Sequence, residues 1–210
     1  MMKRLLPVLA ALSIGTSAVA LTPNELKALV DKRAAAFDPI QALLNDPDPV
    51  RSMAAMELMI ESGEPHLMQS AVDFGLQSAM PEIRRTAVLG FLRSRPTLLL
   101  KVDASQGADE KFEEYFRYAT SGTVLPNGAA TYSVNVGTFD PDQNCFLRTG
   151  SERCAIDVSP TGLSITKVNE SNKNYFTRSN LFFSEDGSLT GATSVANVTG
   201  SFPTTLRLSD

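Results

Sequence analysis

The chain of 210 residues has one histidine, two cysteines and no tryptophan, and the shortage of histidine excludes several kinds of site. His66 has no second histidine to share a metal ion, so the usual His-based zinc sites are excluded. No histidine follows residue 66, which excludes a Ser-His pair within the second half. The chain also lacks a Gly-rich phosphate loop, a Gly-x-Ser-x-Gly elbow and a zinc-protease motif. We therefore expect no cofactor and no metal ion, and the residues favour a protein that is not an enzyme.

Long apolar runs are also lacking, since none reaches the roughly 20 residues that a membrane-spanning helix needs. The apolar run Leu5 to Ile14 follows the basic pair Lys3-Arg4 and precedes the small-x-small motif Ala18-Val19-Ala20. This order predicts a secretory signal peptide over residues 1–20, with an uncleaved N-terminal anchor as the alternative. We expect an exported protein with no stable membrane insertion after cleavage, in the periplasm first of all, or secreted or on the cell surface.

Excess basic charge is absent as well. Removal of residues 1–20 leaves 17 basic and 23 acidic residues. An acidic chain argues against nucleic acid, because phosphates are bound by clustered Lys and Arg. It argues equally against electrostatic binding to an anionic membrane surface.

Composition divides the mature chain into two parts. All seven methionines precede residue 81, whereas twelve of the fifteen aromatic residues follow residue 110. The polar stretch 101–110 lies between these regions. We therefore predict a helical domain over 21–100, a linker over 101–110 and a β domain over 111–210.

Regularly spaced prolines mark helix starts in the first part. Thr22-Pro23-Asn24-Glu25 is a capping box with proline at the first helical position. Pro39, Pro49, Pro65, Pro81 and Pro96 predict five further starts, the last of them a short helix ending near Leu100. Prolines 49 to 96 recur every 15 or 16 residues, so each helix pair takes about 32 residues, the period of a helical solenoid.

The two copies align at an offset of 33 residues, where Val50-Arg51 matches Ile83-Arg84. The segment from Leu44 to Ala55 resembles the turn and second helix of a HEAT repeat, and residues 38–100 resemble about two such repeats. The resemblance implies stacked helix pairs and a protein-binding surface, with Arg51, Arg84 and Arg85 as a candidate partner face. An ordinary small helical bundle is the alternative. Solenoids usually need three or more repeats, so the β part or a partner must cover an open apolar end.

The second part has the signals of a short helix followed by strands. Phe112 to Tyr118 predicts the helix, with Phe112, Tyr115 and Phe116 inward. Alternation of apolar and polar residues then predicts seven or eight short strands. The candidates are 132–136, 145–148, 153–158, 163–168, 181–184, 188–190, 193–199 and 204–208. The expected fold is α+β in two parts: a short HEAT-like helical segment, then a mostly antiparallel β-sandwich or small barrel.

Both cysteines lie in the β part, and an exported chain reaches an oxidising compartment where two cysteines normally pair. A tight turn at Thr149-Gly150 would place Cys145 opposite Cys154 in a hairpin. The spacing is not the C-x-x-C of redox sites. We therefore predict a structural Cys145–Cys154 disulfide, with a redox pair or half a metal site as the alternatives.

Two polar loops could bind ligands. In the stretch from Asn169 to Phe176, the residues Asn172, Asn174 and Tyr175 combine amide and aromatic groups that suit sugars or peptides. Asp140-x-Asp142-x-Asn144 matches the opening of a calcium loop, but the glycine and the final glutamate of an EF-hand are missing. We interpret the first as a candidate ligand loop and the second as an Asp-Pro turn.

These patterns predict a binding or adaptor protein without enzymatic activity. The helical part would dock a protein partner, and the β part would bind a second protein or a glycan. Two alternatives stay open: a hydrolase that acts on cell-envelope polymers with carboxylates of the β part, and a structural accessory subunit of an envelope assembly.

Overall fold

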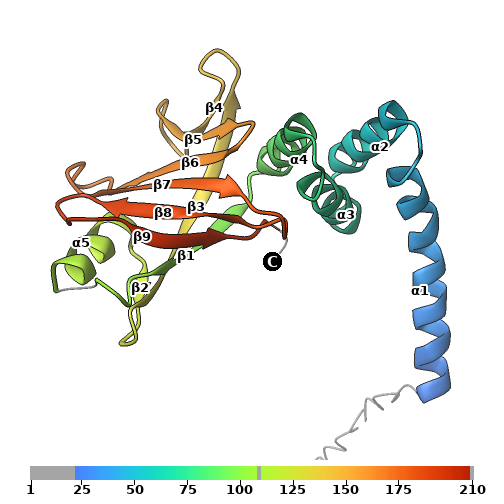
Figure 1. Ribbon diagram of the computed structural model, residues 1–210, viewed down its shortest axis with the longest axis horizontal. Coiled ribbons are helices and arrows are strands. Elements are labelled where there is room, and N and C mark those ends of the chain that lie inside the picture. Colours follow the sequence, from blue (N-terminus) through green and yellow to red (C-terminus); the bar gives the residue numbers. More distant parts are fainter. Residues whose placement is uncertain (1–21, 108–109, 209–210) are drawn as a thin grey trace, which may run out of the picture. The chain divides into compact units, whose positions relative to one another are not determined.

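The computed structural model describes residues 22–107 and 110–208, and the predicted signal peptide lies outside them. From Ile40 onward the chain forms one compact unit, and the residues up to Pro39 belong to another. The helices are α1 (Pro23–Leu44), α2 (Pro49–Glu61), α3 (Pro65–Leu76), α4 (Pro81–Arg93) and α5 (Glu110–Thr120) (Figure 1). In the described residues, none of these helices has both the length and the apolar character to cross a membrane.

The predicted capping box begins α1. The Glu25 carboxylate accepts hydrogen bonds from the backbone nitrogen and the hydroxyl of Thr22, both at 2.8 Å. The prediction of a new helix at Pro39 is wrong, because α1 continues through Pro39 to Leu44. The alanine-rich sequence before this proline has high helix propensity, which favours continuation even though proline removes one backbone hydrogen bond.

Helices α2, α3 and α4 form the predicted stack, and each has proline in its first turn. Gly63 follows α2 with φ +70°, as expected for a helix-terminating glycine. A Cβ on Gly75 of α3 would lie 2.3 Å from the Cβ of Ala87 of α4, so glycine permits these two helices to approach closely. Met56, Val72 and Val88, one from each helix, are buried in the core of the stack.

Residues 97–103 correct two predictions. They form strand β1 (Thr97–Asp103), in place of a last short helix from Pro96 and the start of a linker. Leu98, Leu100 and Val102 are buried in strict alternation with exposed neighbours, the pattern of a half-buried strand. The β part therefore begins at Thr97, directly after the helical stack.

The β part is a nine-stranded antiparallel sheet that closes into an irregular ring. After β1 the strands are β2 (Thr123–Val124), β3 (Ala129–Asp140), β4 (Cys145–Arg148), β5 (Cys154–Ser159), β6 (Gly162–Val168), β7 (Phe176–Phe183), β8 (Leu189–Val195) and β9 (Phe202–Leu206). Their order is β1-β9-β8-β7-β6-β5-β4-β3-β2, and β1 also pairs with β3 to close the ring. The α+β fold in two parts is thus confirmed.

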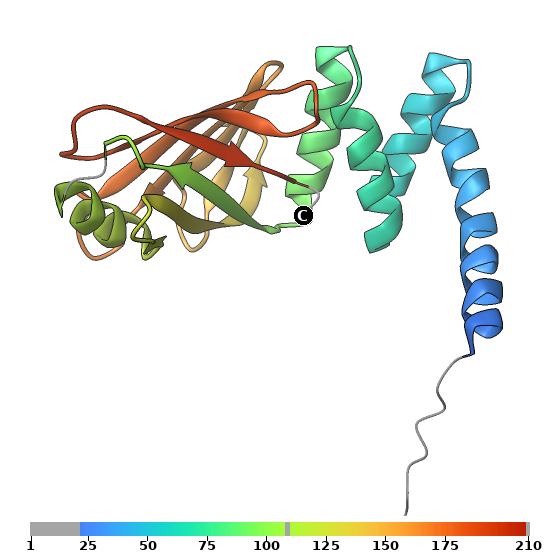
Figure 2. The same cartoon turned by 60° about the horizontal axis from the view of Figure 1, so that its bottom comes forward.

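Helix α5 lies at one end of the ring (Figure 2). Its apolar face is the predicted one, with Phe112 and Phe116 fully buried and Tyr115 half-buried. The Phe112 ring lies 4.4 Å from that of Phe202 in β9, and the Phe116 ring lies 5.6 Å from that of Tyr132 in β3. The aromatic side chains of α5 thus pack into the core of the ring.

A chain of hydroxyl groups crosses the interior of the ring. The Tyr132 hydroxyl bonds to that of Ser179 at 2.6 Å, and Ser179 bonds to Thr193 at the same distance. Thr204 donates to Thr193 at 2.7 Å. All four side chains are buried, so each hydroxyl needs a partner to offset its loss of water. Burial raises the pKa of Tyr132.

We expect Tyr132→Phe to lower the free energy of unfolding by about 1 kcal/mol, because Ser179 loses a buried partner. The pKa of Tyr132 is raised on folding. Its contribution to the free energy of unfolding is therefore complete below the unfolded pKa of about 10, and it is lost as the pH rises from there through the folded pKa. Urea unfolding between pH 8 and 11 should therefore show a steeper loss of stability for the wild type than for Tyr132→Phe. Tyr118→Phe, at an exposed tyrosine, should keep the wild-type slope; a wild-type slope in Tyr132→Phe would contradict the assignment.

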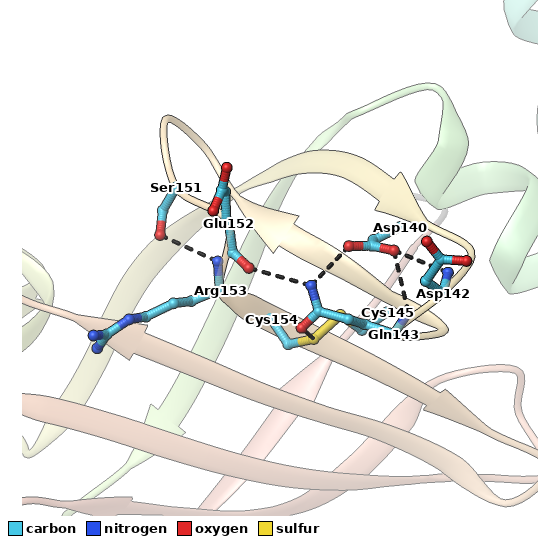
Figure 3. Close-up of a disulfide and its surroundings, with 8 residues drawn as sticks. All are labelled: Asp140, Asp142, Gln143, Cys145, Ser151, Glu152, Arg153 and Cys154. Atoms are coloured by element: carbon cyan, nitrogen blue, oxygen red, sulfur yellow. Dashed lines mark hydrogen bonds between the residues drawn. A yellow bond between two sulfur atoms is a disulfide. The ribbon is translucent and has the colours of Figure 1, made fainter.

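The predicted Cys145–Cys154 disulfide is confirmed, with 5.7 Å between the Cα atoms (Figure 3). The two cysteines are not directly opposite, however. Cys145 faces Asp157 and Cys154 faces Leu147, because the register between β4 and β5 shifts after Phe146. The disulfide indicates an oxidising environment.

Candidate functional site

An open apolar groove lies on the first helices of the stack. It is lined by Ile40 and Leu43 from the last turn of α1, by Arg51, Ala54, Ala55, Leu58 and Met59 of α2, and by Leu67 of α3. Its volume is about 530 Å³. Apart from Arg51, every lining side chain is apolar. The groove is therefore suited to apolar side chains of a ligand.

Local sequence explains how α2 presents this surface. Asp48 caps the helix by accepting a hydrogen bond from the backbone nitrogen of Val50 at 2.9 Å, and Pro49 occupies the first turn. From this start, Leu58 follows Ala54 and Ala55 by four and three residues, so it shares a helix face with both. Met56, on another face, is fully buried in the stack. Helix α2 is therefore apolar toward the stack and toward the groove.

The groove combines a buried floor with exposed walls. Met59 is 7% exposed, whereas Leu43 is 50% and Leu58 is 67% exposed. Neighbouring Val50 and Met53 are also exposed. Contiguous apolar surface of this kind is unfavourable in water and is typical of an interaction site.

The other end of the stack is covered by the ring of strands. The Arg84 guanidinium carbon lies 5.6 Å from the centre of the Phe183 ring, and that of Arg93 lies 5.4 Å from the Phe139 ring. Arg85 donates to the backbone oxygen of Val158 at 3.4 Å. The ring of strands thus covers the stack at α4 and does not reach the groove at α2.

The three arginines of the candidate partner face lie in different surroundings. Arg84 and Arg85 are half-buried, and both contact strands of this same chain, while Arg84 also donates to the backbone oxygen of Ser78. Arg51 lines the groove, where its Nε lies 3.1 Å from a carboxylate oxygen of Asp46. Of the three, Arg51 alone lies at the groove.

The predicted ligand loop, between β6 and β7, meets helix α5. The Tyr175 ring lies 5.3 Å from that of Tyr115 and 5.2 Å from that of Tyr118. The side chain of Asn172 stabilises the loop itself, because its oxygen accepts a hydrogen bond from the backbone nitrogen of Asn174 at 3.1 Å. Tyr118 is 54% exposed and lines a shallow hollow with Glu113, Glu114 and Arg117. The structure thus places Tyr175 in a group of three tyrosines, one of which is exposed.

Two carboxylates of the β part accept hydrogen bonds within turns. Asp140 accepts hydrogen bonds from the backbone nitrogens of Asp142 and Gln143 at 2.9 and 3.1 Å (Figure 3). Its bond with the Gln143 side chain is the largest cause of a lowered Asp140 pKa. Asp186 likewise accepts from the hydroxyl and backbone nitrogen of Ser188, and the hydroxyl is the larger cause of its lowered pKa. These two carboxylates stabilise turns.

One group of three metal-ligating residue types occurs among the described residues, Cys145, Cys154 and Asp157. The two sulfur atoms are joined in the disulfide, so neither is a thiolate that could bind a metal ion. Asp157 is therefore left as the sole ligand of the three.

Apart from Arg51, the groove residues were not predicted as a site from the sequence. The signal that could have identified them is the composition of α2, in which Val50, Met53 and Leu58 are apolar in addition to the residues that face the stack. A helix that is apolar on most sides needs more than one packing partner.

Comparisons of the chain with protein-family models, with curated proteins and with solved structures found no match. The protein is therefore characterised by its own structure: a helical stack joined to a closed antiparallel sheet, with an apolar groove on the stack.

Proposed function

We propose that the protein is an exported adaptor that binds a partner protein in the apolar groove of its helical stack. The observation that carries the proposal is the exposure of Leu58 and Leu43 above a buried floor, at the end of the stack that the ring does not cover. A stack of two HEAT-like repeats with one covered end would use a partner to cover the other. The disulfide supports export to the periplasm.

The same groove suits a structural accessory subunit, which would use it within a larger envelope assembly. The two readings differ in the partner: an adaptor binds it reversibly, whereas an accessory subunit stays in a permanent complex. Identification of the protein that lies against Leu58 distinguishes them.

The test is site-specific photo-crosslinking in cells that express the exported chain. A photoreactive residue at position 58 should crosslink to a partner, whereas the same residue at position 125 should not. Leu125 is a matched control because it is also half exposed and lies outside the groove. Absence of any crosslinked protein at position 58 would contradict the proposal.

For the crosslinked protein in purified form, we expect Leu58→Gln to weaken binding about tenfold or more, a loss of roughly 1.4 kcal/mol. Glutamine has high helix propensity and nearly the size of leucine, so α2 should remain folded. Leu125→Gln is the control and should bind as the wild type does in a titration calorimeter. Equal affinity of both variants would place the partner elsewhere.

A second candidate function is glycan binding by the β part at the tyrosine group. The favouring observation is exposed Tyr118 beside Glu113, Glu114 and Arg117, since an aromatic face with charged and polar neighbours suits a sugar ring. This site would be independent of the groove.

A further inference from the structure

The segment that contains the groove residues carries a strong excess of negative charge. Between residues 40 and 80 there are six acidic residues, one arginine and one histidine. The acidic residues are Asp46, Asp48, Glu57, Glu61, Glu64 and Asp73. The arginine, Arg51, is paired with Asp46 at 3.1 Å, so it does not offset the other acids.

Three of these carboxylates border the apolar surface. Glu57 and Glu61 are exposed on α2, one turn beyond the groove residues Ala54 and Leu58 respectively. Glu64 is exposed at the start of α3, one turn before the groove residue Leu67. An apolar groove with acidic borders attracts a ligand that is apolar on one side and basic on its flanks.

The groove also has the length of a short helix. The lining residues of α2 run from Arg51 to Met59, which corresponds to about 12 Å of helix axis. A partner helix packed beside α2 would contact this surface over roughly two turns, with apolar residues at i, i+3 or i+4, and i+7.

We propose that the occupant of the groove is a cationic amphipathic helix of another protein. The inference rests on the proposed function and names the chemistry of the partner. Leucine-like side chains of the partner fill the groove formed by α2, the last turn of α1 and Leu67 of α3, and its Lys or Arg residues face Glu57, Glu61 and Glu64.

The charges disfavour two other occupants. A second copy of the chain could offer the helix at residues 22–38. This segment has three acidic and three basic residues, so it lacks the net positive charge that would complement the acidic borders of the groove. An anionic lipid surface would be repelled by the same carboxylates that attract a basic helix.

The test uses the mature chain, residues 21–210, and two fluorescent 18-residue peptides. Both peptides have the same leucine face, and their polar face is built from lysine in one and from glutamate in the other. By fluorescence anisotropy at low salt, the lysine peptide should bind at least tenfold more tightly. The difference should shrink in 0.5 M NaCl, where charges are screened within a few Å.

Two variants assign the effect to the groove and its borders. The triple change Glu57→Gln, Glu61→Gln and Glu64→Gln should weaken the lysine peptide about three- to tenfold, whereas Glu113→Gln with Glu114→Gln on α5 should have no effect. Leu58→Gln should weaken both peptides. Together these results would support a cationic helix in the groove.

Other outcomes overturn the inference. Equal affinity for the two peptides, still lowered by Leu58→Gln, would overturn the charge preference and leave groove binding intact. Failure of both peptides would overturn the inference, while the crosslink at position 58 independently decides whether the groove binds a protein. A dimer of the mature chain that Leu58→Gln abolishes would identify a second copy as the occupant instead.

Discussion

Phe116→Ala is expected to lower the free energy of unfolding by about 3–5 kcal/mol, the range found for buried phenylalanines. Phe116 is 0% exposed, and its ring lies 5.2 Å from that of Phe112 and 5.6 Å from that of Tyr132. Alanine would leave a cavity where α5 packs on the ring of strands. The change also removes an aromatic neighbour of Tyr132, the residue that begins the hydroxyl chain.

Urea unfolding followed by far-UV circular dichroism measures this loss. Tyr118→Ala is the matched control on the same helix, since Tyr118 is 54% exposed and should change stability by less than about 0.5 kcal/mol. A loss below about 1 kcal/mol for Phe116→Ala would show that α5 does not pack on the core of the ring as described.

Reduction of the Cys145–Cys154 disulfide is expected to lower the free energy of unfolding by about 2–3 kcal/mol. The bond joins residues nine positions apart and restricts the unfolded chain over β4 and the turn that leads to β5. Cys145 is fully buried, so substitution alone would mix a packing loss with the loss of the crosslink. Reduction of the wild-type protein separates the two effects.

The measurement compares urea midpoints with and without a phosphine reductant. The double variant Cys145→Ala, Cys154→Ala is the control, and its midpoint should not respond to the reductant. An unchanged midpoint for the reduced wild-type protein would show that the disulfide contributes nothing to folding stability.

Local signals predicted the helices well. Proline in the first turn, Thr22 with Glu25 at the start of α1, and Gly63 after α2 each act through neighbouring backbone groups, so they can be identified without knowledge of the tertiary structure. One exception is Pro39, which lies inside a helix because the favourable sequence around it outweighs the one hydrogen bond it removes.

The region after Pro96 shows where local signals fail. Leu98, Leu99 and Leu100 can belong to a helix or to a strand, because a short apolar run has no clear period. Pairing with β3 and β9 makes this segment a strand. That pairing joins residues far apart in the chain, so local signals do not reveal it. For the same reason, residues 101–103 were predicted as part of a linker, although they belong to the strand that closes the ring.

The sequence by itself determined the starts of α1 to α4, the division into a helical and a β part, and the pairing of the two cysteines. These follow from capping groups, from periodicity and from there being only two cysteines to pair. The tertiary structure decided which apolar residues are covered. Met56 and Leu58 lie two residues apart on α2, yet one is buried in the stack and the other is 67% exposed in the groove. Apolar character is a property of each side chain, whereas its burial depends on which other elements pack against it, and here the ring covers α4 and leaves α2 open.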